Sequence, residues 1–186
     1  MIYIDDHIDE FDLQQALTQV SPSRREYALR YRHERDQRCC VAAYRLLQRA
    51  LLQQYGLGGT LELIHDRGGR PALAGYPDIH ISLSHCREAV AVAVDDQPIG
   101  IDIETLDHYS EDVAHHVMSE AEMQQILSAV EPATTFTRLW TMKESLFKLT
   151  GSDNGGDIAH MLDEAWRYHF TTIVHPSYLC TTVKKH

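Results

Sequence analysis

Hydrophobic and polar residues alternate most strictly at residues 99–104, where isoleucine takes every second position. Because successive side chains of a β-strand point to opposite faces, the isoleucines are predicted to enter a core. Asp102 and Glu104 then share the other face with Gly100. Same-face positions are roughly 7 Å apart, so both carboxylates can reach one hard cation and repel each other without it. A solvated strand face is the simpler alternative.

A period of about 3.6 residues runs from 136 to 149 and ends at Gly151, which predicts a helix. Its expected apolar face consists of Phe136, Leu139, Trp140, Leu146 and Phe147. Lys143 falls in the middle of this face, and an unpaired buried ammonium costs several kcal/mol, so we expect a protein carboxylate or a ligand phosphate beside it. Glu144 and Lys148 lie along one edge as an i,i+4 pair, for which an ordinary salt bridge is the alternative.

The remaining pattern predicts a chain that mixes helices and strands. Helices are expected at residues 10–20, from Ser21 and Pro22 onward, and at 34–55, 113–118, 120–130 and 158–164. Strands are expected at residues 1–4, 61–64, 79–85 and 89–94, with a terminal hairpin at 166–174 and 178–183. The turn at 95–98 is predicted to join strands 89–94 and 99–104 into a central hairpin.

Composition narrows the class of protein. The 186 residues, 44% of them hydrophobic, suit one large or two small packed units, which we expect to act as a monomer. The acidic N-terminus and the lack of an apolar run of about 18 residues argue against a signal peptide or a membrane span and favour the cytoplasm. The four cysteines lack C-x-x-C spacing and are expected to be reduced thiols, and the twelve histidines show no zinc motif.

Charge is unevenly distributed along the chain. Residues 24–49 hold eight arginines and three acidic residues, a net charge of +5, whereas the remainder carries −15 and the whole chain −10. One basic segment in an acidic chain indicates a local anion site or a surface for an acidic partner. It argues against broad nucleic-acid binding.

Two further sites have side chains suited to anions. Arg70 stands before Pro71 in a glycine-rich turn, and Ser84 and His85 close a predicted strand. A hydroxyl and an imidazole both donate hydrogen bonds to anionic oxygen. A serine–histidine nucleophile is disfavoured, because adjacent residues of a strand point apart and no G-x-S-x-G motif is present.

Residues 98–104, followed about forty residues later by 140–148, resemble the paired signature of 4'-phosphopantetheinyl transferases of the surfactin-synthetase-activating (Sfp) type. The resemblance extends from about residue 21 to 151. It implies an α+β fold of two similar halves related by a pseudo-twofold axis. The N-terminal half would be 1–97, with the basic helices and coenzyme A contacts, and the C-terminal half 98–186, with the metal site.

The resemblance also implies a function. Such an enzyme transfers 4'-phosphopantetheine from coenzyme A to a serine of an acyl or peptidyl carrier protein, with Mg²⁺, and releases adenosine 3',5'-bisphosphate. Asp102, Glu104 and Glu144 would hold the metal; Glu144, or a water it orients, would accept the serine proton, and Lys148 would stabilise charge on the phosphate. The residues expected to bind coenzyme A are Arg24, Arg70, Ser84, His85, Lys143 and Lys148.

Several alternatives stay open. Glu122 matches a family glutamate sometimes given a catalytic part, but its place in a capping box explains it equally well. Arg35 and Arg38 are both candidates for a further coenzyme A contact. Beyond Gly151 the resemblance weakens and the second half is short. A metal-dependent nucleotide phosphohydrolase, or a non-catalytic coenzyme A-binding module, would share many of these residues, and the carrier's pathway is open among fatty-acid, polyketide and peptide synthesis.

Overall fold

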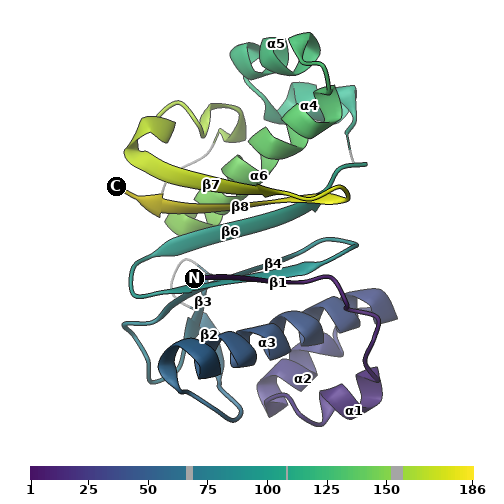
Figure 1. Cartoon of the computed structure of the whole chain (residues 1–186), viewed down its shortest axis with the longest axis vertical. Coiled ribbons are helices and arrows are strands. Elements are labelled where there is room, and N and C mark those ends of the chain that lie inside the picture. The colour runs from purple at the N-terminus through teal and green to yellow at the C-terminus, as the bar shows by residue number, and fades with distance from the viewer. Residues whose placement is uncertain (66–68, 108, 152–156) are drawn as a thin grey trace.

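The computed structural model describes residues 1–65, 69–107, 109–151 and 157–186. Two three-stranded antiparallel sheets lie in the middle of the molecule, and helices cover their outer faces (Figure 1). Helices α1 to α3 lie on one side and α4 to α6 on the other. This arrangement is the predicted α+β mixture.

The first half forms the sheet β1-β5-β4. Its elements are β1 (Ile2–Asp5), α1 (Leu13–Leu17), α2 (Pro22–Ala28), α3 (Glu34–Tyr55), β2 (Leu63–His65), β3 (Pro71–Leu73), β4 (His80–His85) and β5 (Val90–Asp95). Strands β2 and β3 make a separate two-stranded ribbon. Helix α3 ends as predicted at Gly56, whose left-handed φ of 69° a residue without Cβ adopts readily.

The second half forms the sheet β6-β8-β7. Its elements are β6 (Ile99–Thr105), α4 (Glu111–Val117), α5 (Glu120–Ser128), α6 (Pro132–Thr150), the 3₁₀ turns η2 (Ile158–His160) and η3 (Ala165–Arg167), β7 (Tyr168–Val174) and β8 (Tyr178–Lys185). In both halves a strand, a long helix and a hairpin follow one another, and the first strand pairs with the last. The twofold axis itself and the division at residue 97 stay predictions.

The predicted central hairpin is wrong. Strand β5 is hydrogen-bonded to β1 on one side and to β4 on the other, so it has no free edge for β6. Strand β6 pairs with β8 instead, from Ile99 opposite Lys184 to Thr105 opposite Tyr178. The turn at 95–98 therefore carries the chain from one sheet into the other.

A shared core holds the two sheets together. The isoleucine face of β6 packs as predicted, and its partners include Ala91 and Ala93 of β5, Ala89 just before that strand, and Cys180 of β8. The opposite face of β5 presents Val90, Val92 and Val94 to α3. Burial of both faces explains why residues 89–94 form an unbroken apolar run.

Other expectations need correction. The helix expected at 10–20 is limited to Leu13–Leu17, and the one at 158–164 to a short 3₁₀ turn. Phe147, expected on the buried face of α6, is 46% exposed. The glycine-rich turn that precedes Pro71 lies partly outside the described residues. Within the described ranges, no helix is long and apolar enough to span a membrane.

Candidate active site

Helix α6 lies directly on β6, and Gly100 permits this approach. A Cβ at position 100 would lie 2.0 Å from the carbonyl oxygen of Ser145 and 3.0 Å from the amide nitrogen of Leu149, so any side chain would push the helix away. The close packing brings Glu144 and Lys148 of α6 over the strand face that Asp102 occupies. Gly100, which shares this face with Asp102, therefore leaves the room that the helix occupies.

Ser84, Asp102 and Lys148 form one hydrogen-bonded cluster. The Lys148 Nζ lies 2.7 Å from Asp102 Oδ1 and 2.8 Å from Ser84 Oγ, and the Ser84 hydroxyl donates to the same Asp102 oxygen at 2.8 Å. The aspartate side chain is 4% exposed and that of the lysine 28%. The cluster joins β4 of the first half to β6 and α6 of the second, so the sequence prediction that these residues share a site is consistent with their positions.

The carboxylates around this cluster have the chemistry of a cation site. The second oxygen of Asp102, Oδ2, is buried and has no hydrogen-bond partner among the described residues. Burial, and then the negative charge of Asp102, raise the pKa of Glu144, while Lys148 acts in the opposite direction. Glu104 is half-buried farther along β6. An orphaned carboxylate oxygen beside other acids is what a hard cation such as Mg²⁺ would satisfy.

The three predicted metal ligands are nevertheless not gathered into a cluster. Over the described ranges, no three His, Cys, Asp or Glu side chains are close enough together to hold a metal ion. The ammonium of Lys148 occupies the first oxygen of Asp102 and supplies the neighbouring positive charge. The donor set fits a hard cation, and the triad itself stays a prediction.

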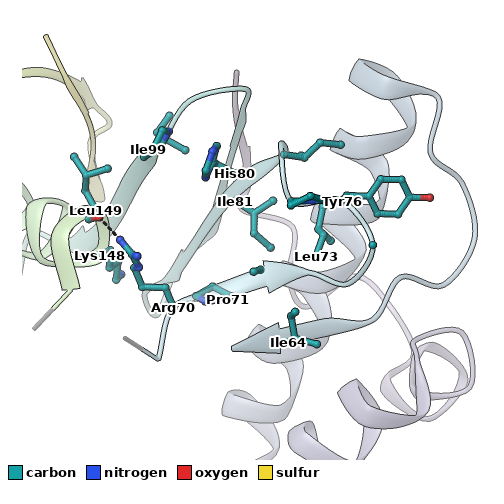
Figure 2. Close-up of a pocket in the computed structure, with 15 residues that line it drawn as sticks. Ile64, Arg70, Pro71, Leu73, Tyr76, His80, Ile81, Ile99, Lys148 and Leu149 are labelled. Carbon is teal, nitrogen blue, oxygen red and sulfur yellow. Dashed lines mark hydrogen bonds between the residues drawn. The ribbon is translucent and has the colours of Figure 1, made fainter. Parts of the chain in front are cut away.

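Three other predicted coenzyme A residues, His85, Arg70 and Arg24, come from the first half of the chain. His85 follows Ser84 at the end of β4. The pKa of its imidazole is lowered, first because neighbouring protein groups shield it from water and then because the positive charge of Lys148 is near. Arg70 donates a hydrogen bond of 2.6 Å to the carbonyl of Leu149, across the gap to the end of α6 (Figure 2). Arg24, in the first turn of α2, donates to the carbonyl of Cys40 at 2.8 Å.

Lys143 lies on a different side of α6 and is fully buried. Its ammonium contacts Glu122 at 2.9 Å and the carbonyls of Ile158 and Ala159 at 2.7 and 2.9 Å. The anion predicted beside it is therefore a protein carboxylate. Glu122 also completes the predicted capping box, accepting a hydrogen bond from the amide of Ser119. A contact between Lys143 and coenzyme A stays a prediction, although three protein groups already use its three donors.

The two undecided arginines of α3 bind groups outside the cluster. Arg35 contacts Asp9 and the carbonyl of Arg87, and Arg38 contacts Glu34 and the carbonyl of Phe11. Sequence reasoning named Glu122 and Lys143 separately and missed their pairing. The sequence offered a signal for this pairing, because a buried lysine needs an acidic partner and the glutamate of a capping box has a second oxygen that can bind one.

Comparison with known proteins places this chain in a family. A sequence model of the 4'-phosphopantetheinyl transferase superfamily matches residues 98–181, which contain Asp102, Glu144 and Lys148. The 4'-phosphopantetheinyl transferase Sfp of Bacillus subtilis is 31% identical over 81% of this chain and 68% of its own length. The transferase psf-1 of Bacillus pumilus is 33% identical over 80% of this chain and 65% of its own length.

A more distant relative is the L-aminoadipate-semialdehyde dehydrogenase-phosphopantetheinyl transferase of Saccharomyces cerevisiae, 33% identical over 53% of this chain and 41% of its own length. The chain belongs to the 4'-phosphopantetheinyl transferases, and within them to the Sfp type. It is accordingly an enzyme that transfers 4'-phosphopantetheine, as the resemblance of the two motifs implied.

Proposed function

We propose that this enzyme takes 4'-phosphopantetheine from coenzyme A and attaches it to a serine of an acyl or peptidyl carrier protein, with Mg²⁺ and with adenosine 3',5'-bisphosphate as the second product. The cluster of Ser84, Asp102 and Lys148 carries the proposal. A hydroxyl and an ammonium beside a buried carboxylate combine anion donors with a cation ligand. A pyrophosphate together with a divalent ion requires this combination.

The proposed reaction moves one proton and exchanges one phosphorus–oxygen bond. The carrier serine oxygen bonds to the phosphorus that carries pantetheine, the bond from that phosphorus to the bridging oxygen breaks, and adenosine 3',5'-bisphosphate leaves with the bridging oxygen. A carboxylate oxygen of Glu144 accepts the serine proton. Its raised pKa supports this role, because a base whose pKa lies nearer to neutrality accepts a proton more readily.

Asp102, Glu104 and Glu144 would hold Mg²⁺. When bound there, the ion would neutralise pyrophosphate charge and polarise the phosphoryl group. Lys148 would place a further positive charge beside the reacting phosphate. Its hydrogen bonds to Ser84 and Asp102 orient the ammonium before substrate arrives, so little reorganisation is needed in the transition state.

The residues of the first half would hold the nucleotide. Ser84 and His85 stand at the cluster, and Arg70 reaches the end of α6 beside Lys148. Arg24 lies with Arg30 in the lining of a cavity of about 440 Å³. The acidic net charge supports the expectation that nucleic acid is not a partner. Action as a cytoplasmic monomer, with halves divided at residue 97, is part of the same proposal.

Mass spectrometry of an apo carrier protein tests the function. After incubation with coenzyme A and Mg²⁺, the carrier should gain the mass of one phosphopantetheine. Omission of Mg²⁺ should prevent the gain, and the substitution Asp102→Asn should slow it at low Mg²⁺. A nucleotide phosphohydrolase would release adenosine 3',5'-bisphosphate and leave every carrier unmodified. Calorimetric binding of coenzyme A with neither adduct nor release would indicate the binding module instead.

A further inference from the structure

Two sheet edges meet at the active site without forming a continuous sheet. Strand β4 is an outer strand of the sheet β1-β5-β4, and β6 is an outer strand of the sheet β6-β8-β7 (Figure 1). No backbone ladder joins β4 to β6 among the described strands, although the cluster takes Ser84 from one and Asp102 from the other. The alignment of these two edges therefore rests on side-chain contacts.

Two serines of β4 connect this strand to β6. The apolar residues of β4 pack into the core beneath α3, so Ser82 and Ser84 share the opposite face of the strand. Ser84 binds the carboxylate of Asp102, whereas Ser82 Oγ accepts a hydrogen bond of 3.1 Å from the backbone amide of Ile101. Ser82 is 4% exposed, and sequence reasoning did not single it out.

The amide of Ile101 points away from its own sheet. Alternate residues of an antiparallel strand direct their amides away from the paired strand, and the N–H of Ile101 is directed towards β4. Ser82 supplies the acceptor that a further paired strand would otherwise provide. A buried amide without an acceptor is unfavourable, so an apolar residue at position 82 would leave this amide unpaired or let β6 shift. The next residue along β6 is Asp102.

We propose that Ser82 is a positioning residue of the enzyme, which acts through the Ile101 amide to hold Asp102 in place for Mg²⁺. This inference rests on the proposed function, in which Asp102 is a metal ligand. Two attachments on adjacent residues, from Ser82 to the backbone and from Ser84 to the side chain, fix both the position and the direction of the carboxylate. Groups that orient a metal ligand commonly contribute about 10–100-fold to metal affinity.

Removal of the Ser82 hydroxyl tests this role without changing any proposed ligand. Ser82→Ala should raise the Kd of Mg²⁺ about tenfold, measured by calorimetry at saturating coenzyme A. The Kd of coenzyme A at saturating Mg²⁺ should change by less than about twofold, because Ser82 is not proposed to touch that ligand. The rate of carrier modification should fall at low Mg²⁺ and recover at high Mg²⁺.

Hydrogen exchange of the Ile101 amide reports the contact itself, independently of activity. In Ser82→Ala this amide should exchange at least about tenfold faster, as followed by NMR. The amide of Asp102 is the internal reference, because the alternation of an antiparallel strand directs it towards β8. Its exchange should change much less.

Tyr44→Phe is the matched control for loss of a buried acceptor. The Tyr44 hydroxyl accepts a hydrogen bond of 2.9 Å from the backbone amide of Leu61, within the first half of the chain. This variant therefore also leaves a buried amide without its acceptor, but it does so away from β6. It should lower the melting temperature as Ser82→Ala does and change the Kd of Mg²⁺ by less than about twofold.

Two further variants separate the hydroxyl from the shape of the side chain. Ser82→Thr and Ser82→Val fill the same space, which guards against a packing defect in Ser82→Ala, and only the threonine keeps an acceptor. Mg²⁺ should bind to the threonine variant nearly as well as to the wild type and more weakly to the valine variant. In an Asp102→Asn background, Ser82→Ala should shift the Kd of Mg²⁺ by less than about twofold, because the two changes act through one carboxylate.

Three results would overturn the role of Ser82: an unchanged Kd of Mg²⁺ in a folded alanine or valine variant, an equal rise in Tyr44→Phe, or full additivity with Asp102→Asn. Failure of the wild-type enzyme to bind Mg²⁺ with coenzyme A, or to modify any carrier, is a different result. It would overturn the proposed function, and the role of Ser82 with it.

Discussion

The two halves of the chain share a connectivity and use it differently. In the first, α3 packs on β5 through an apolar interface that includes Val90, Val92 and Val94. In the second, α6 packs on β6 across Gly100, and polar groups line the same interface. One arrangement stabilises the fold and the other builds a site. Because Ser84 comes from the first half, the cluster needs both halves in place.

Two lysines of helix α6 show the same contrast between a structural contact and a site contact. Lys143 is completely buried and bound to protein groups, whereas Lys148 is partly exposed at the cluster. Five residues separate them, which is about one and a half helical turns, so they project from different sides of the helix. Position on the helix, and not residue type, decides which lysine is available to substrate.

The largest expected effect comes from removing the charge of Glu144 in the second half. Glu144→Gln keeps the size and one oxygen of the side chain. If the carboxylate is the proton acceptor, the turnover rate should fall about 10²–10⁴-fold even at saturating Mg²⁺. Steady-state rates of carrier modification over a wide range of Mg²⁺ concentration measure this.

Asp102→Asn is the comparison variant for Glu144, because it should behave as loss of a ligand alone. Partial rescue of Asp102→Asn by high Mg²⁺, without rescue of Glu144→Gln, would support a dual role for Glu144. Rescue of both variants would leave Glu144 a ligand only. Near-normal activity of Glu144→Gln at low Mg²⁺ would contradict the mechanism.

Lys143 should matter for stability more than for substrate binding. Lys143→Met leaves the carboxylate of Glu122, whose side chain is 12% exposed, without its partner. Removing one member of a buried ion pair costs about 3–5 kcal/mol of unfolding free energy. Urea unfolding measures the loss, and the KM of the folded protein for coenzyme A should stay close to that of the wild type.

The double variant Lys143→Met with Glu122→Gln separates the two roles of the lysine. It removes both charges, so part of the lost stability should return. If Lys143 instead contacts coenzyme A, the KM should rise in the double variant as well as in Lys143→Met. Glu122→Gln alone would then leave the KM unchanged.

On the first half, Arg70→Ala should raise the KM for coenzyme A by about tenfold with a smaller effect on kcat, because a contact kept in both the ground and the transition state contributes mainly to binding. The paired change of Ser84 and His85 to alanine should act in the same direction. Arg167, an exposed arginine paired with Glu164, is the control. An unchanged KM for coenzyme A with weaker carrier binding would contradict the assignment of these residues to the coenzyme A site.

Local sequence patterns predicted many of the helices and strands. They predicted the pairing of distant strands much less well. The limits of α3 and the alternation in β6 follow from neighbouring residues, so they could be predicted from sequence. The placement of β6 beside β8 could not, because Ile99 pairs with Lys184, 85 residues away. A short turn between two apolar strands usually makes a hairpin, and here the occupied edges of β5 prevent it.

The same limit applies to the site. Paired motifs identified Asp102 and Lys148, but not that Ser84 would bind both. The side-chain positions of Arg24 and Arg70 depend on packing between segments distant in sequence. Their hydrogen bonds to backbone carbonyls could not be read from the chain.

The smallest expected effect concerns another aspartate–lysine pair, Asp95 with Lys184, which joins β5 of the first half to β8 of the second. Burial alone would raise the pKa of Asp95, but the hydrogen bonds it accepts, with that from Lys184 the largest, lower the pKa to about 2. A carboxyl whose pKa falls on folding stabilises the fold above its unfolded pKa of 3.8, and this contribution disappears as pH falls towards 2.

Lys184→Met should therefore lower the unfolding free energy by about 1–2 kcal/mol at pH 7, a value reduced for the partial exposure of the lysine. The difference from the wild type should shrink as pH falls below about 4, because protonated Asp95 gains little from the lysine. Urea unfolding between pH 7 and pH 2 measures it. Lys185→Met, which changes the exposed neighbour on β8, is the control. If the difference in unfolding free energy stays constant with pH, Lys184 stabilises the contact between β5 and β8 by packing of its side chain and not through the charge of Asp95.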